Sequence, residues 1–376
     1  MNRIRRLVKD AGPVLVGTLV LLALLEVGAR LVVGAPRGIF RGFLPGAEGL
    51  YPANATIEMI WGPIPYRVST NSLGFRGAEL PRTRAAGAVR IAAMGDSVTD
   101  GFFVDDDATY PHFLQQELAD RGLETEVVNA ARGSGSIDKS LAILKDAVLP
   151  LEPDVVLLTV VTNDISDLRG RTDPQVVSVR LARGGVPLSL RLITATGLGE
   201  LTYDLYLRAV SEPYRRRRER ASAGAARYEI AGGASFARNV RVFGKRYADT
   251  DGLVLEEPLR PSTEALLERY RFGLDHFLVV CAERGITVGL VYFPAYPEVY
   301  GAARAARLLE VLGDQSVERG AGFLDLTSVF RREGESRVLH LAPVDFHPNP
   351  AGNELMAEAV AEFVVASLLP RSRESR

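Results

Sequence analysis

Short apolar runs recur along the chain, and stretches with helical spacing separate them. The run at residues 154–161 is the clearest, because its unbroken Val and Leu content is typical of a parallel strand covered on both faces. The strands are predicted at residues 90–94, 126–129, 154–161, 286–293 and 322–326. The helices are predicted at residues 109–118, 140–149, 263–283, 304–320 and 353–368. This alternation predicts an α/β fold with a doubly wound, mainly parallel five-stranded sheet flanked by helices.

Two segments depart from this alternation. Residues from about 166 to 262 contain the basic run Arg215–Arg220 and a small-residue stretch, and they predict a mostly helical, exposed insertion. A lid over a substrate site is the functional alternative for this insertion. Residues 35–67 are rich in Gly, Pro and aromatic side chains, and they predict an irregular stalk that packs on the domain. The α/β domain itself is expected over residues 68–370.

Residues 1–34 carry the pattern of a signal anchor. Arg3, Arg5, Arg6 and Lys9 precede apolar residues that continue to Val33, a length near the 20 or so residues that span a bilayer. Glu26 and Arg30 are four positions apart and can pair on a helix. The positive flank predicts a bacterial transmembrane helix whose following domain is extracytoplasmic, in the periplasm or outside the cell.

A secreted protein is the alternative for this N-terminus. Val27-Gly28-Ala29 resembles a small-residue cleavage site, so the apolar segment could be a signal peptide that is removed. A buried helix of a soluble protein is the third interpretation of the same residues.

Composition and charge exclude some partners. Hydrophobic residues make up 47% and charged residues 24% of the chain, as in an ordinary globular protein. The formal net charge of −1 and the lack of a basic stripe argue against a nucleic-acid partner. The one cysteine, Cys281, lies in an apolar run and is expected to be buried. Neither composition nor charge indicates an oligomeric state.

Polar residues and glycines collect where the predicted strands end. Gly95-Asp96-Ser97-Val98 follows the first strand, Gly133 lies in the loop after the second, and Asn163 follows the third. Asp345 and His347 precede the last helix. Each block alone is an ordinary turn or helix cap. Ligands of open α/β sheets bind at the carboxyl ends of the strands, so the order of these blocks predicts a single site.

The residue types suit nucleophilic catalysis. A serine hydroxyl needs a base to remove its proton, and imidazole titrates near neutral pH, so Ser97 and His347 are the candidate nucleophile and base. Asp345 could hold the imidazole in the required tautomer. His112 and His276 lie within predicted helices, and His340 lies in an apolar context. The dispersed histidines, and the lack of HExxH or a phosphate-binding glycine loop, indicate neither a metal nor another cofactor.

These blocks resemble the SGNH hydrolase superfamily, also called GDSL esterases and lipases, in a membrane-tethered bacterial branch. The resemblance covers roughly residues 68–165 and 265–368. It implies that Ser97 is the nucleophile and His347 the base, and that the oxyanion hole consists of the backbone N–H groups of Ser97 and Gly133 with the side chain of Asn163. Gly135 is an alternative to Gly133.

Two positions depart from the family pattern. Val344 stands where the family has the aspartate that orients its histidine, which leaves Asp345 as the nearby candidate. Val161 stands where the family has a glycine two residues before the asparagine.

The expected function is therefore hydrolysis of a small-molecule or glycan ester through an acyl-serine intermediate. The spacing of Asp345 and His347, together with the tether, also suits an O-acetyltransferase or deacetylase of an exported polysaccharide. The departures at Val161 and Val344 leave a third alternative, a non-catalytic glycan-binding domain on a degenerate hydrolase fold.

Overall fold

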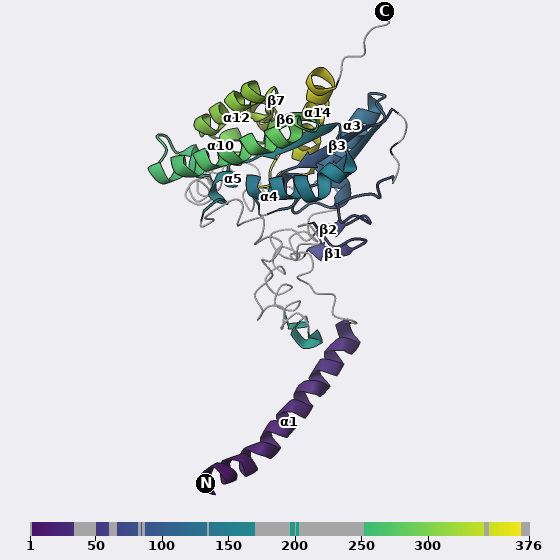
Figure 1. Cartoon of the computed structure of the whole chain (residues 1–376), viewed down its shortest axis with the longest axis vertical. Helices are drawn as coiled ribbons and strands as arrows, with labels where there is room; N and C mark the ends of the chain where they lie inside the picture. Colours follow the sequence, from purple (N-terminus) through teal and green to yellow (C-terminus); the bar gives the residue numbers. More distant parts are fainter. Residues whose placement is uncertain are drawn as a thin grey trace, which may run out of the picture.

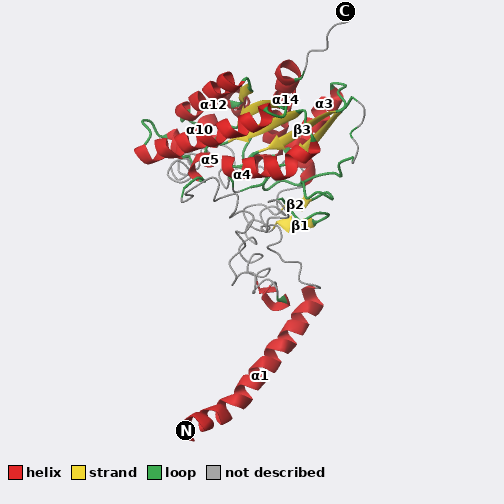
Figure 2. Cartoon of the chain, in the orientation of Figure 1, coloured by secondary structure: helices red, strands yellow, loops and turns green. Residues whose placement is uncertain are grey.

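The central sheet contains five parallel strands. In a computed structural model of the chain, the described residues are 2–33, 50–59, 66–81, 84, 87–133, 135–169, 196–199, 201–202, 252–341 and 346–369. The strands run in the order β4-β3-β5-β6-β7, and every neighbouring pair is parallel (Figures 1 and 2). They are β3 (Val89–Met94), β4 (Thr125–Asn129), β5 (Val155–Val160), β6 (Thr287–Tyr292) and β7 (Gly322–Asp325). The predicted doubly wound α/β fold is confirmed.

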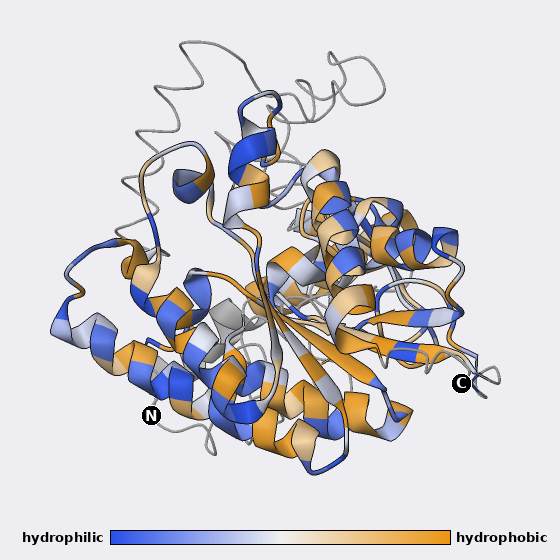
Figure 3. Ribbon diagram, turned by 90° about the horizontal axis from the view of Figure 1, so that it is seen from above, coloured by the Kyte–Doolittle hydropathy of each residue, from blue (hydrophilic) through white to orange (hydrophobic). Residues whose placement is uncertain are grey.

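Helices cover both faces of the sheet. One face carries α4 (Ile137–Ile143), α10 (Pro261–Ala282) and α12 (Ala306–Arg319). The other carries α3 (Tyr110–Asp120), α13 (Thr327–Gly334) and α14 (Pro350–Phe363). Alternate strand residues enter the two layers, so Ala92 and Met94 pack in the first core and Ile91 and Ala93 in the second. Figure 3 shows the hydrophobic strands enclosed between these helices.

The predicted strands lie within one residue of the observed bounds at each end, whereas some helices differ more. The helix expected at 140–149 begins at Ile137, widens to a π-helical turn over Leu144–Val148 and ends in a 3-10 turn at Leu149–Leu151. Helix α14 begins before its predicted start, because the Asn349 side chain accepts the N–H of Gly352 and caps the helix. It ends in a π-helical turn at Val364–Leu368. Helix α13 was not predicted at all.

An antiparallel hairpin packs beside the sheet. Strands β1 (Thr56–Met59) and β2 (Tyr66–Ser69) lie mostly within the range expected to form a stalk. Tyr51, Tyr66 and Val68 pack with Phe102, Phe103 and Leu341, which belong to loops of the α/β domain. In Figure 1 the hairpin lies on the side of the sheet that faces the N-terminal helix.

The N-terminal helix α1 (Asn2–Val33) extends away from the sheet (Figure 1). Its segment Pro13–Val32 has a mean hydropathy of 2.1 and is 6% buried, so by length and composition it could cross a membrane. A signal sequence would satisfy the same criteria. The expected pairing of Glu26 with Arg30 is present at 2.6 Å, and Glu26 also accepts the backbone N–H groups of Gly197 and Leu198.

Most of the expected insertion, including the basic run Arg215–Arg220, lies outside the described residues. Its described parts are short. They include α5 (Asn163–Ser166), which leads into it, residues 196–199 and 201–202, and a 3-10 turn at Leu253–Leu255.

Two neighbouring glycines leave an area of the sheet without side chains. Gly289 of β6 and Gly322 of β7 are register partners. Phe363 and Leu368 from the end of the chain's last helical segment pack on both, and a Cβ at Gly289 would lie 2.7 Å from Leu368 and 2.9 Å from Phe363. The two glycines therefore provide the space in which this segment meets the sheet.

We expect Gly289→Ala to destabilise the protein by about 1–3 kcal/mol, because the added methyl overpacks this contact. Gly313→Ala is the matched control, since a Cβ there meets nothing within 4 Å and the residue lies inside α12. Alanine at that helical position should stabilise by about 1 kcal/mol. Urea unfolding measures both changes, and a Gly289→Ala variant as stable as wild type would contradict the packing explanation.

Candidate active site

Ser97 lies at the carboxyl end of β3, at the start of a short helix. Helix α2 (Ser97–Asp100) is capped by the Asp96 side chain, which accepts the N–H of Val98 at 3.0 Å. It ends at Gly101, whose φ of +89° is in the left-handed region, and a Cβ there would lie 2.4 Å from Thr109. The strand order reverses on either side of β3, so Ser97 lies at the position where ligands bind in this class of sheet.

Ser97 and His347 are in hydrogen-bond contact. Ser97 Oγ lies 2.7 Å from His347 Nε2, so the hydroxyl can donate to the imidazole when Nε2 is unprotonated. The segment that carries His347 is held by backbone pairing, since Leu341 N–H donates to the His347 carbonyl and Asn349 N–H donates to that of Leu339. Both Ser97 and His347 are buried, with 6% and 5% of their surfaces exposed. The structure thus brings together the two residues expected to act as nucleophile and base.

Three phenylalanines surround the His347 ring. Phe346 stacks on it at a centroid distance of 4.7 Å, Phe103 meets it edge-on at 5.2 Å, and Phe102 lies tilted at 5.5 Å. Phe103 has a φ of +66°, which is uncommon and costly for a non-glycine residue. This aromatic shell limits the imidazole to few orientations and shields it from water. Sequence reasoning missed it, although Phe102-Phe103 directly follows the serine-containing block.

Asn163 lies next to Ser97 through a shared acceptor. Its side-chain N–H donates to Asp96 Oδ2 at 2.9 Å, and Ser97 Oγ is 3.2 Å from the same oxygen. An amide nitrogen has two hydrogens, so this bond uses only one of them. Asp96 therefore ties the turn of Ser97 to the start of α5.

The backbone of Gly133 has a different environment from the one expected of an oxyanion donor. Its N–H donates to Asp100 Oδ2 at 2.9 Å and not toward Ser97. A Cβ on Gly133 would lie 2.1 Å from the Phe102 ring, so the packing of that ring leaves no room for a side chain here. Spacing along the chain does not reveal this contact, because it depends on which side chain covers the loop.

The remaining candidate residues lie elsewhere. Asp345 lies outside the described residues. His112 and His276 are on the surface, where their ring nitrogens contact Gln116 and Lys145. His340 is fully buried between the Tyr300 hydroxyl and the Pro294 carbonyl, each 3.3 Å away. Within the part of the chain that the structure describes, no cluster of His, Cys, Asp and Glu suits a metal ion.

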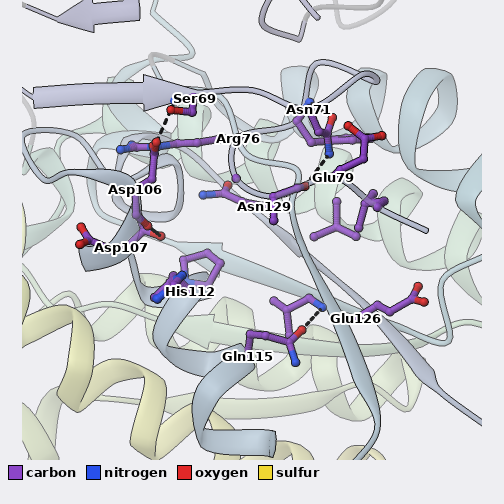
Figure 4. A pocket seen from close by; sticks show the side chains of 18 of the residues that line it. Ser69, Asn71, Arg76, Glu79, Asp106, Asp107, His112, Gln115, Glu126 and Asn129 are labelled. Carbon is purple, nitrogen blue, oxygen red and sulfur yellow. Dashed lines mark hydrogen bonds and ion pairs between the residues drawn. The ribbon is translucent and has the colours of Figure 1, made fainter. Parts of the chain in front are cut away.

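A cavity of about 460 Å³ lies beside the edge strand β4, and neither Ser97 nor His347 lines it (Figure 4). Several of its polar groups are engaged with one another. Asp106 accepts the Ser69 N–H and the Nε–H of Arg76, and Gln115 accepts the Val127 N–H. The cavity is thus separate from the serine–histidine pair, and its groups complete the bonding of the sheet edge.

The family model for the GDSL-like lipase/acylhydrolase family matches residues 93–355. This match covers well over half of the chain, and the chain belongs to that family. The resemblance inferred from the four sequence blocks is confirmed. No curated protein matches the chain significantly.

Several solved structures are distantly similar to this chain, and three of them follow. TesA is 15% identical, with 74% of this chain and 99% of that chain covered and a TM-score of 0.42. The acetyl xylan esterase AlAXEase is 14% identical, with 73% and 100% covered and a TM-score of 0.41. A catalytic mutant of Axe2, an acetylxylan esterase from Geobacillus stearothermophilus, is 13% identical, with 78% and 100% covered and a TM-score of 0.42.

A second buried carboxyl group lies close to Asp96. Burial raises the pKa of Asp164 well above its usual range, and the negative charge of Asp96 raises it further. The N–H of Val161, which donates to Asp164 at 3.0 Å, opposes this shift. Because the pKa is raised, the folded protein keeps this proton to higher pH than the unfolded chain does.

We expect Asp164→Asn to stabilise the protein at neutral pH, on the order of 1 kcal/mol or more. A raised folded pKa gives stability that is fully present below the unfolded pKa of about 4 and is lost as the pH rises through the folded pKa. Asparagine cannot ionise and still accepts the Val161 N–H. The gain should therefore vanish toward acidic pH, as measured by thermal unfolding over a pH series. An equal gain at every pH would contradict this assignment.

Proposed function

We propose that the protein is an esterase that hydrolyses carboxylic esters with Ser97 as nucleophile and His347 as general base. The observation that carries the proposal is the 2.7 Å contact between Ser97 Oγ and His347 Nε2 at the carboxyl end of β3. Membership of the GDSL-like lipase/acylhydrolase family supports ester hydrolysis in general. The substrate class is a small-molecule or glycan ester.

The proposed reaction has two stages. His347 Nε2 removes the Ser97 proton while Oγ attacks the ester carbonyl, and the imidazolium then gives that proton to the departing alcohol. A water molecule, activated by the same imidazole, hydrolyses the acyl-serine and releases the acid. Asp345 is proposed to orient the imidazole.

Two donors next to Ser97 suit the developing oxyanion. The N–H of Ser97 is the first in α2 and has no partner within the helix. The second side-chain hydrogen of Asn163 is the other donor, and loss of one such donor costs roughly 3–4 kcal/mol of transition-state stabilisation. Gly133 was expected to be a third donor, but it could serve only if its N–H left Asp100.

We also propose that α1 is a signal anchor that holds the domain outside the cytoplasmic membrane. Leu15, Leu19 and Leu24 are 62%, 57% and 64% exposed, which favours an apolar environment around α1 over packing within a soluble protein. The proposed organisation is an anchor at residues 1–34, a connecting segment at 35–67 and the hydrolase-like domain at 68–370.

We expect a fluorophosphonate probe to label the wild-type chain at Ser97, because the probe reacts with a serine that a neighbouring base activates. Ser97→Ala should abolish labelling and ester turnover, and His347→Ala should lower turnover by at least about a thousandfold. Ser316→Ala is the matched control, since Ser316 is also 6% exposed and its hydroxyl donates to the Gly313 carbonyl within α12. Mass spectrometry of the labelled peptide identifies the site.

The same assay separates the alternatives. A folded wild type that neither reacts with the probe nor releases acid from esters, yet binds oligosaccharide, would support the non-catalytic glycan-binding domain. Transfer of acetyl from a donor ester to an oligosaccharide, in place of release of free acetate, would support the acetyltransferase.

We expect the full chain to stay in the membrane fraction after alkaline carbonate extraction, because a helix of about 20 apolar residues spans a bilayer. Release of the domain with a new N-terminus near Ala29, detected by intact mass, would show cleavage and a secreted protein instead.

A further inference from the structure

A fully buried carboxylate lies one helical turn after Ser97. Asp100 has 0% of its surface exposed and takes no part in the contacts between Ser97, His347 and Asn163. Its two oxygens accept the hydroxyl of Tyr51, at 2.8 and 3.0 Å, and Oδ2 accepts the N–H of Gly133 at 2.9 Å. Burial of a carboxylate is costly unless hydrogen bonds and opposite charges compensate it, so this arrangement needs an explanation.

Two guanidinium groups supply the opposite charge. Arg76 and Arg132 each approach the Asp100 carboxylate to 4.0 Å, and the Arg132 guanidinium lies 3.6 Å over the Tyr51 ring. The five N–H donors of Arg76 are all used. One binds the Asp106 carboxylate, and the others bind the backbone carbonyls of Arg67, Asp100, Gly101 and Val104. Figure 4 shows Arg76 reaching Asp106 at the wall of the cavity.

The carboxylate thereby joins four separate segments of the chain. Tyr51 precedes the hairpin, Arg76 follows it, Asp100 ends the helix of Ser97, and Arg132-Gly133 follows β4. Asn129, the last residue of β4, adds a link because its side chain donates to the Thr99 carbonyl at 3.0 Å. Any shift of the Asp100 carboxylate would therefore move the loop after β4 relative to α2.

The same loop supports the aromatic shell of the base. The Phe102 ring rests on Gly133, as the 2.1 Å approach to a Cβ there shows, and it lies 5.5 Å from the His347 ring. The chain of contacts runs from Asp100 to Gly133, from Gly133 to Phe102 and from Phe102 to His347. Asp100 is therefore connected to Ser97 through the helix and to His347 through the loop.

We propose that Asp100 is a positioning residue of the esterase, whose carboxylate holds the Gly133 loop and thereby Phe102 in the arrangement that keeps His347 in contact with Ser97. The proposal rests on the proposed function of the serine–histidine pair. It assigns no contact between Asp100 and the substrate, so its loss should slow the chemical step and leave substrate binding nearly unchanged.

The test compares two buried carboxylates in the full chain in detergent, with p-nitrophenyl acetate as substrate. Glu298 is the matched control. It is also 0% exposed, accepts the Tyr292 hydroxyl at 2.6 Å and accepts the N–H groups of Ala295 and Ala305, but it follows β6 and not β3. Asp100→Asn and Glu298→Gln each remove one buried charge with little change in shape.

We expect Asp100→Asn to lower kcat about tenfold to a hundredfold with KM within about twofold, because small displacements of reacting groups are costly. Its rate of fluorophosphonate labelling should fall in parallel. Glu298→Gln should lose thermal stability but keep kcat within about twofold. Assays are run well below the melting temperature of each variant.

Three outcomes would overturn the proposal. A folded Asp100→Asn variant with wild-type kcat would show that the carboxylate is not needed for positioning. Equal losses of kcat in both variants would show a general effect of stability. An increase of kcat in Asp100→Asn would show that Asp100 keeps the Gly133 N–H from acting as an oxyanion donor. A wild type that is neither labelled nor active would instead refute the proposed function itself.

Tyr51→Phe is the second test of the proposal if Asp100→Asn does not fold. It removes one of the two kinds of hydrogen bond to the carboxylate and leaves the Gly133 contact. We expect a kcat lowered by about two- to tenfold at unchanged KM. An unchanged kcat in this variant would overturn the proposal.

Discussion

The contact between Ser97 and His347 depends on two segments that are 250 positions apart in the chain. Each segment holds its own residue, but neither brings the two residues together. Ser97 is fixed by a four-residue helix at the end of β3, and His347 by a bridge between His340 and Pro348. The parallel sheet brings them together because the carboxyl ends of its strands share one edge.

The buried carboxylates of Asp96 and Asp100, on either side of Ser97, are compensated by different kinds of partner. Asp96 is bonded to neutral donors, the Val98 N–H and the Asn163 amide, and it raises the pKa of the neighbouring Asp164. Asp100 lies between two guanidinium groups. Charge close to the serine is thus balanced by dipoles on one side and by cations on the other. The two sides of the site depend on different parts of the chain.

The hairpin and the residue Tyr51 before it contact side chains that surround Ser97 and His347. Tyr51, just before the hairpin, donates its hydroxyl to the Asp100 carboxylate. Tyr66 of β2 packs against the Phe102 and Phe103 rings, which contact the His347 ring. In Figure 1 this hairpin lies between the sheet and α1.

The sequence by itself determined the sheet and the members of the central pair. Buried parallel strands such as β5 have unbroken apolar runs, and Ser97, Asn163 and His347 follow strands or precede a helix at recognisable spacings. The hydrophobic pattern does not predict helix α13 or the hairpin, because their segments are short and lack a regular hydrophobic period. Only the tertiary structure decided that Gly133 faces Asp100 and that Phe102 covers it, since both contacts join segments about 30 residues apart whose meeting depends on the pairing of β3 with β4.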